Sequence, residues 1–171
     1  MAAGVTFINE TTRNPLRDRL MRLLGDNACR IQVAALPWRL VDGNVEVLLI
    51  TSRDTGRWVI PKGWPEGDEA YSDAAAREAG EEAGISGAVA PNEIGRYYYF
   101  KQLSSGSEKR CQVRVFPMEI DRVRDKWPER RKRQRAWFSP QEAAKRVREP
   151  DLAQIIGQSA ANPRAYPSRR S

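Results

Sequence analysis

Apolar residues gather in short stretches in the first third of the chain, and turn-forming residues separate them. Arg30–Arg39 is rich in valine, alanine and tryptophan, and Val45–Thr51 (VEVLLIT) returns after the pair Asp42-Gly43. An Asp-Gly pair between two apolar stretches is a strong signal for a tight hairpin turn. The pattern therefore predicts two antiparallel strands. Arg57–Ile60 is predicted to be a short extended segment, because Pro61 stops it.

The spacing becomes helical after this region. Gly63 to Asp68 holds two glycines and a proline, which indicates a loop. A helix is predicted to begin at Ser72 or Asp73, either of which can cap its first turn, and to end at Gly84. Gly80 lies inside this helix, where glycine costs roughly 1 kcal/mol relative to alanine. Its missing side chain would let another element pack closely.

The second half of the chain continues with strand signals and one more helix. Further strands are predicted at Ile94–Lys101, Cys111–Ile120 and Ala136–Phe138. Ser139-Pro140 precedes Gln141–Arg148, which is predicted to be a helix with proline in its first turn. Strands around one central helix, followed by a second helix, predict an α/β fold with a mixed sheet and helices packed against its faces.

The two ends differ in composition from the middle. Residues 1–28 form a basic leader in which arginines alternate with leucines, a spacing compatible with one amphipathic helix. Residues 29–160 are predicted to form one domain, and residues 161–171 a loose tail. No apolar run approaches the roughly 20 residues of a membrane span, and we expect no signal peptide. Cys29 and Cys111 are expected to be free thiols of a cytoplasmic protein.

Charge and composition narrow the possible chemistry. Histidine is absent, so acid–base or metal chemistry must use carboxylates, lysine, tyrosine or bound water. The 29 basic and 22 acidic residues give a formal charge of +7, which fits either simple solubility or a polyanionic partner. Acids are dense between Glu66 and Glu82, whereas residues 130–135 form a basic run. This run is either a solvated loop or a collar for a substrate with many phosphates.

Acidic residues recur on the predicted helix at positions that share one face. Glu78 lies three residues before Glu81 and four before Glu82, so the three carboxylates are predicted to converge. Like charges at this spacing repel, and Mg²⁺ or Mn²⁺ would compensate them because carboxylates suit hard cations. Arg77 could orient a glutamate through paired hydrogen bonds. Glutamates on helices are more often solvated, but a preceding glycine-bearing loop at Gly63 favours a metal site.

The same residues resemble the signature of the Nudix hydrolases. The pattern reads Gly63, Glu69, and then Arg77–Ile85 (REAGEEAGI), in which every fixed position matches and only Ala79 is smaller than usual. The chain looks most like the branch of diphosphoinositol polyphosphate phosphohydrolases, through LLITSRDTGRWVIPKG before the signature and KWPERRKRQRAWFSPQEAAKRV after it. The resemblance implies an α/β/α sandwich with a mixed sheet. It also implies attack of water on a nucleoside or inositol pyrophosphate bond.

The resemblance also implies roles for individual residues. The expected ligands of Mg²⁺ or Mn²⁺ are the Gly63 carbonyl, Glu78 and Glu82, with Glu81 and Glu69 as additional ligands. Glu81 is expected to be either the general base or an extra ligand, and Glu69 either braces the loop or binds an additional ion. The implied catalytic residues are Arg77, Glu78 and Glu81. Basic side chains outside the signature would hold the remaining phosphates. The candidates are Arg53, Lys62, Arg110, Arg133 and Arg135, with Arg30 and Ser52 as weaker ones.

Two departures from the usual pattern leave the metal-binding helix intact but affect the path of the loop and the fit of the substrate. Lys62 stands where a first glycine is common, and Glu66–Glu69 shifts the loop glycine by one place. The favoured substrate is a diphosphoinositol polyphosphate or a dinucleoside polyphosphate. The alternatives are removal of pyrophosphate from an RNA 5′ end, cleavage of a nucleoside diphosphate derivative, and an inactive binding protein with this fold. The sequence leaves a monomer and a homodimer open.

Overall fold

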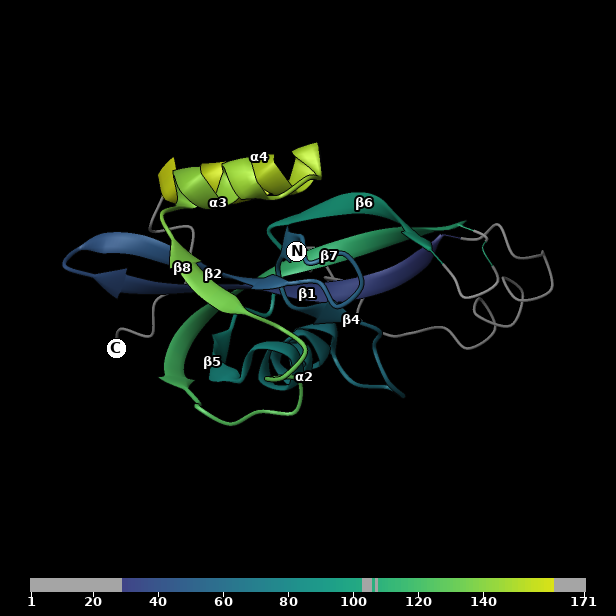
Figure 1. The fold of residues 1–171 in the computed structure, drawn as a ribbon, viewed down its shortest axis with the longest axis horizontal. Helices are drawn as coiled ribbons and strands as arrows, with labels where there is room; N and C mark the ends of the chain where they lie inside the picture. The colour runs from purple at the N-terminus through teal and green to yellow at the C-terminus, as the bar shows by residue number, and fades with distance from the viewer. Residues whose placement is uncertain (1–28, 103–105, 107, 162–171) are drawn as a thin grey trace, which may run out of the picture.

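The computed structural model describes residues 29–102, 106 and 108–161 (Figure 1). The amphipathic helix expected within residues 1–28 lies outside this part of the chain. The tail expected at residues 161–171 also falls outside it, apart from residue 161. The outer domain boundaries therefore stay predictions.

The predicted hairpin opens the sheet. Strands β1 (Arg30–Val41) and β2 (Asn44–Thr51) pair antiparallel, with Val41 opposite Asn44. Asp42 and Gly43 both have positive φ, at 51° and 80°, which is what a tight two-residue hairpin turn requires. Strand β3 (Trp58–Val59) then pairs with β2, so the predicted short extended segment is also confirmed.

The remaining strands complete a mixed sheet. They are β4 (Lys62–Gly63), β5 (Ile85–Val89), β6 (Gly95–Gln102), β7 (Glu108–Val123) and β8 (Arg135–Phe138). The central strands β1 and β7 run parallel, whereas β5 and β6 pair antiparallel with β7, and β8 pairs antiparallel with β2. A mixed sheet is therefore confirmed.

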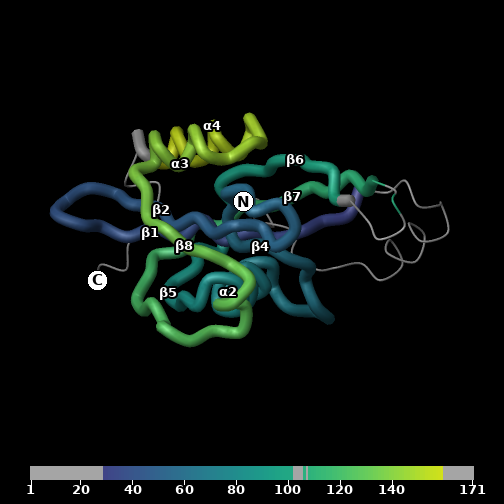
Figure 2. Tube along the Cα trace, in the orientation of Figure 1, coloured from purple at the N-terminus to yellow at the C-terminus, as the bar shows by residue number. Residues whose placement is uncertain are grey.

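Helices cover both faces of this sheet (Figures 1 and 2). Helix α2 (Tyr71–Ala83) lies on one face, where its alanines pack against Val33, Leu48 and Phe116. Helices α3 (Pro140–Arg146) and α4 (Pro150–Ala161) lie on the other face, and together with the sheet they enclose a second core cluster. The α/β/α sandwich implied by the resemblance is confirmed.

Three local predictions need correction. Gly63 is not loop but pairs with Val33, because after Pro61 the chain runs alongside β1 and the Ala35 amide donates to the Pro61 carbonyl at 3.1 Å. Strand β5 was not predicted, since its sequence ISGAV is short and contains a glycine. Helix α4 was not predicted either, although its proline stands at the first helical position.

Candidate active site on the carboxylate helix

Helix α2 is positioned by small residues on its buried side. Ala74, Ala75, Ala79 and Ala83 have no exposed surface, so the helix lies close to the sheet. Gly84 ends the helix in the left-handed region at φ 65°, as predicted, and its amide donates to helix carbonyls. The helix begins at Tyr71 rather than at Ser72 or Asp73, and no side chain caps its first turn.

The Glu78 carboxylate lies directly against the backbone of Gly63. A Cβ atom at residue 63 would stand 2.1 Å from Cδ of Glu78, so no side chain fits there while the carboxylate keeps its place. The two residues come from different elements, β4 and α2. The fold therefore joins Gly63 and Glu78, two of the residues expected to hold a cation.

Arg77 connects the loop after β4 to the helix. Its guanidinium donates to the Trp64 carbonyl, to Glu69 Oε1 and to Glu78 Oε1, each at 2.9 Å. The hydrogen bond from Arg77 also lowers the pKa of Glu69. Glu69 accepts a further hydrogen bond from the Glu66 amide at 2.6 Å. Arg77 thus joins Glu78 to Glu69, and Glu69 in turn bonds to the loop at Glu66; whether Glu69 also binds an ion stays a prediction.

Glu82 is the most enclosed carboxylate of the helix. It is 8% exposed, accepts a hydrogen bond from the Lys62 amide at 3.0 Å and forms an ion pair with Arg133. Burial raises the pKa of Glu82 and also that of Glu78. Both carboxylates are therefore in surroundings that disfavour an uncompensated negative charge.

The three glutamates do not converge as predicted. The side chain of Glu81 is 49% exposed and approaches Arg77 at 3.6 Å, whereas Glu78 faces Gly63 and Glu82 faces Lys62. In the described part of the chain, no three acidic or sulfur side chains form a ready-made metal cluster. Each of the three glutamates has an arginine partner in this structure, Arg77 for Glu78 and Glu81 and Arg133 for Glu82.

The donors nevertheless fit a hard divalent cation. The carboxylates of the half-buried Glu78 and the buried Glu82 and the carbonyl of Gly63 are oxygen ligands, the kind that Mg²⁺ and Mn²⁺ prefer. The space at Gly63 is filled by the Glu78 carboxylate and not by packing atoms. Together with Glu82, these groups are the residues that would hold such an ion.

The connection between β7 and β8 closes the other end of helix α2 (Figure 2). Four successive carbonyls, from Glu81 to Gly84, accept hydrogen bonds from this segment. The donors are the amides of Glu129 and Arg124, the Trp127 indole and the Arg135 guanidinium. The last carbonyls of a helix lack intrahelical partners and favour nearby cations. The β7–β8 connection is therefore docked on the carboxylate helix through residues 124–129 and Arg135, whereas Arg130, Arg131 and Lys132 of the basic run are exposed.

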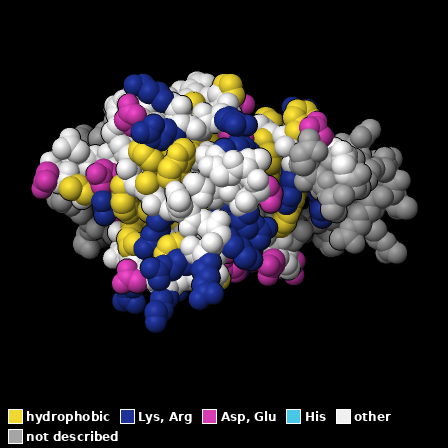
Figure 3. Space-filling model, viewed as in Figure 1, with side chains coloured by type: hydrophobic (Ala, Val, Ile, Leu, Met, Phe, Trp, Pro, Cys, Tyr) yellow, Lys and Arg dark blue, Asp and Glu magenta, His cyan; other side chains and the backbone are white. Residues whose placement is uncertain are grey.

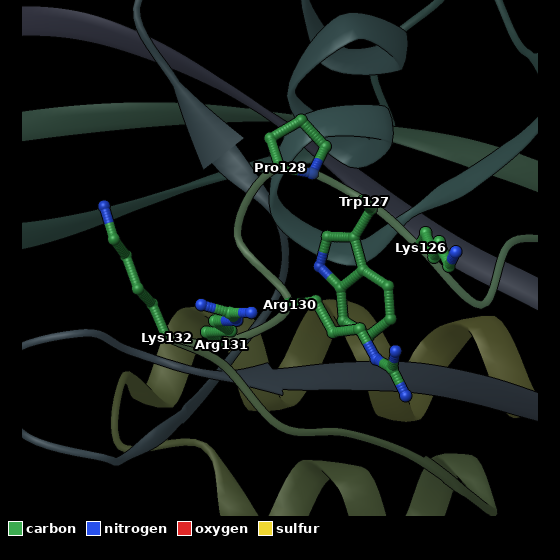
Figure 4. Close-up of a pocket in the computed structure, with 6 residues that line it drawn as sticks. All are labelled: Lys126, Trp127, Pro128, Arg130, Arg131 and Lys132. Carbon is green, nitrogen blue, oxygen red and sulfur yellow. The ribbon is translucent and has the colours of Figure 1, made fainter.

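The same connection forms a basic hollow of about 380 Å³ (Figure 4). It is lined by Lys126, Trp127, Pro128, Arg130, Arg131 and Lys132. Trp127 is fixed by its hydrogen bond to the Glu82 carbonyl at 3.2 Å, and the guanidinium of Arg135 lies 4.1 Å from its ring centre. Within the described residues, none of the four lining cations has an ion pair. Figure 3 shows lysine and arginine side chains gathered at this edge.

Residues 30–157 match the NUDIX domain. The chain belongs to the Nudix family. The match spans all the strands and most of α4, and it includes the carboxylate helix, which is the Nudix helix.

Curated relatives support the family at moderate identity. Nudix hydrolase 12, mitochondrial, of Arabidopsis thaliana is 32% identical over 135 residues, which are 69% of this chain and 66% of the relative. Nudix hydrolase 16, mitochondrial, of the same plant is 32% identical over 73% of this chain and 76% of the relative. Diphosphoinositol polyphosphate phosphohydrolase 3-beta of Bos taurus is 30% identical over 58% of each chain. The chain thus spans roughly two-thirds or less of several of these relatives.

Solved structures share the fold at lower identity. An Ap4A hydrolase binary complex from C. elegans has a TM-score of 0.60 at 19% identity, and covers 80% of this chain and 99% of that one. The NUDIX domain of Shewanella oneidensis NrtR, complexed with ADP ribose, has a TM-score of 0.59 at 16% identity and covers 81% and 89%. No described helix of this Nudix chain is long and apolar enough to span a membrane.

The predicted substrate residues fall into separate groups around the Nudix helix. Arg133 pairs with Glu82 and Glu129, and the exposed Arg53 pairs with Glu129 at 3.2 Å. Half-buried Lys62 lies in β4, and burial lowers its pKa. Arg135 donates to the carbonyls of Ala83 and Arg124 and so holds the connection.

Two of the candidates lie farther from the helix. Arg110 lies over the Tyr98 ring at 4.7 Å. On the same strand, Arg114 pairs with Val33, and Val33 in turn pairs with Gly63. Arg110 lies four residues from Arg114, which is roughly 13 Å along the strand. Arg30 lies over the Trp64 ring at 4.8 Å. No described contact joins Arg110 to the carboxylates, and its role as a phosphate ligand stays a prediction.

Two features near the site were not predicted from the sequence. Glu129 bonds to both Arg53 and Arg133, and it is the sole acid between Lys126 and Arg135. A lone acid in a basic run is a signal that could have identified it. The second feature is the ion pair of Arg57 with Glu149. These residues lie far apart in the sequence, so no local pattern could predict their contact.

Proposed function

We propose that this protein is a Mg²⁺- or Mn²⁺-dependent hydrolase that cleaves a phosphoanhydride bond of a highly phosphorylated small molecule. The family assignment supports hydrolysis, and the position of the Glu78 carboxylate against Gly63 is the observation that carries the metal dependence. Gly63, Glu78 and Glu82 would hold the cation, with Glu69 and Glu81 as further candidates.

The chain's own groups divide the remaining work. A bound divalent cation would neutralise phosphate charge and lower the pKa of a water molecule. Glu81 is the most exposed glutamate of the helix, so it is the candidate that can take a proton from the attacking water. Arg77 keeps Glu78 in place through its hydrogen bonds to Glu69 and the Trp64 carbonyl.

A substrate panel with divalent ions tests this function. The purified protein should hydrolyse at least one diphosphoinositol or dinucleoside polyphosphate with Mg²⁺ or Mn²⁺, and chelation should stop the reaction. Glu81→Gln should lower kcat by about 100-fold or more, the usual contribution of a general base, while thermal unfolding stays unchanged. Full activity of Glu81→Gln would remove Glu81 from the chemistry.

The basic hollow supports a substrate with several phosphates. Its four lysine and arginine side chains have no ion pairs in the described chain and lie beside the end of the Nudix helix. An anionic group could therefore bind them without breaking an existing ion pair. Changing Arg130, Arg131 and Lys132 to alanine should raise KM for a polyphosphate substrate about tenfold, by loss of charged hydrogen bonds. KM for a nucleoside diphosphate sugar should change little. Equal effects on both substrates would exclude the hollow from substrate selection.

A second candidate activity is removal of pyrophosphate from an RNA 5′ end, since the same cations would also attract a nucleic acid. RNA turnover exceeding that of all small polyphosphates would favour it. Cleavage of nucleoside diphosphate derivatives and an inactive binding role are outcomes of the same panel. We further propose a cytoplasmic protein, monomeric or homodimeric, consistent with the free thiols Cys29 and Cys111.

A further inference from the structure

The proposed metal ligand Glu82 already has a cationic partner from the chain. One guanidinium nitrogen of Arg133 bonds to Glu82 Oε1, and the Lys62 amide donates to Oε2 at 3.0 Å. Both oxygens of this buried carboxylate are therefore engaged. The guanidinium compensates the negative charge of Glu82, which would be costly without a partner because Glu82 is only 8% exposed.

Arg133 is itself enclosed by groups outside the helix. It is 9% exposed, its Nε bonds to Glu129, and another nitrogen donates to the Thr51 carbonyl at 3.0 Å. These partners belong to the β7–β8 connection and to the end of β2. Arg133 can therefore leave Glu82 and still keep two partners beside the site.

We propose that Arg133 occupies the position at Glu82 that a divalent cation takes, so that metal binding displaces the guanidinium and frees it for a substrate phosphate. This inference rests on the proposed function, since it takes Glu82 as a metal ligand. Arg133 then acts as a positioning residue for Glu82 in the metal-free protein. After metal binding it becomes a phosphate ligand.

Electrostatics dictates the exchange. A guanidinium and a divalent ion on one carboxylate repel each other strongly inside a protein, where charges are poorly screened. The ion would compensate Glu82 more fully, because it carries two charges and binds oxygen directly. The released fork of Arg133 matches the geometry of phosphate oxygens. Metal binding would thus prepare the substrate site, and the metal would have to bind first.

Whether Arg133→Gln binds Mn²⁺ more tightly or more weakly than the wild-type protein tests the exchange. Mn²⁺ binding is measured by electron paramagnetic resonance, without substrate, for the wild-type protein and Arg133→Gln. If Arg133 competes with the ion, the variant should bind Mn²⁺ about tenfold more tightly, as expected for loss of a charged hydrogen bond. If Arg133 only supports Glu82, the variant should bind more weakly. Equal or weaker binding overturns the inference.

Arg53→Ala is the matched control. It removes a positive charge from the same Glu129 without contact to Glu82, so its Mn²⁺ affinity should stay within about twofold. A gain equal to that of Arg133→Gln would show a general charge effect and would overturn the exchange. Glu82→Gln should bind Mn²⁺ much more weakly, which tests the ligand assignment itself.

A measurement on the wild-type protein does not depend on the folding of any variant. Mg²⁺ should increase the modification of Arg133 by phenylglyoxal, localised by mass spectrometry, because the guanidinium leaves its buried pair. Labelling of Arg77 should stay low, since Arg77 keeps Glu69 and the Trp64 carbonyl. Unchanged labelling of Arg133 overturns the inference, whereas failure of the wild-type protein to bind Mn²⁺ overturns the proposed function as well.

Discussion

The contact between Gly63 and Glu78 predicts that adding a methyl group at residue 63 lowers activity strongly but leaves stability almost unchanged. In Gly63→Ala, the new Cβ would stand 2.1 Å from Glu78 Cδ, and ordinary contact begins at 3.4 Å. The carboxylate must therefore move by about 1.3 Å. A displacement of about 1 Å in an active site can cost on the order of 100-fold in rate, and we expect a fall in kcat of that size.

Stability should hardly respond to the same change. The clashing atoms are the end of a side chain that can rotate, and the backbone of Gly63 is not in the left-handed region. Loss of glycine flexibility in the unfolded chain offsets part of any strain, so the free energy of unfolding should change by less than about 1 kcal/mol. Urea unfolding and kcat on the best substrate measure the two effects.

Gly80→Ala is the control on the helix itself. A Cβ atom there would meet nothing closer than the Ile85 carbonyl oxygen at 3.7 Å, so the close packing expected at Gly80 is not present. The variant should gain up to about 1 kcal/mol of stability with kcat unchanged. If Gly63→Ala kept full activity, or lost activity only because it unfolded, the placement of Glu78 against Gly63 would not govern the reaction.

Three further perturbations test other parts of the structure. Trp127→Ala should cost about 2–3 kcal/mol in urea unfolding, because the indole packs on Gly84 and donates to the helix end; a loss under about 0.5 kcal/mol would contradict that role. Leu152→Ala should cost about 2–5 kcal/mol, since Leu152 is fully buried in the core under α4; a smaller loss would argue against this packing of α4. Burial raises the pKa of Glu78 and Glu82 above 4.5. At these two groups the folded metal-free protein therefore binds protons more tightly than the unfolded chain does, and they make it less stable as pH rises from 4.5 through the raised values. Thermal unfolding of Glu82→Gln in chelator should show a smaller loss over this range than the wild-type protein, and Mg²⁺ should reduce the wild-type loss; identical pH profiles would contradict this.

Much of the fold follows from local patterns. The Asp42-Gly43 turn fixes the first hairpin, and Gly84 ends the helix, because both depend on backbone conformations that few residues adopt. Strand β5 and helix α4 escaped prediction because tertiary pairing stabilises them. Ile85–Val89 is a weak strand by itself, and it forms by pairing with β7 across a register shift.

The sequence named the candidate residues of the site but not how they are arranged in space. Spacing placed Glu78, Glu81 and Glu82 on one helix and Arg77 beside Glu78, but it could not show that the buried Glu82 acquires an arginine partner from outside the helix. The pairing of Glu82 with Arg133 joins residues 51 positions apart. Such a contact depends on how the β7–β8 connection folds over the helix, and helical spacing carries no information on it.

The distribution of partners around the Nudix helix implies an order of events. Arg77 bonds to Glu78, Glu69 and a backbone carbonyl, so an ion at Glu78 would leave Arg77 anchored in the loop. Arg133 has its principal buried partner in Glu82, and its other anion, Glu129, is shared with Arg53. An ion at Glu82 would therefore leave two arginines with one acid beside the site. That surplus of positive charge would arise only with metal bound, which is when a phosphate chain needs it.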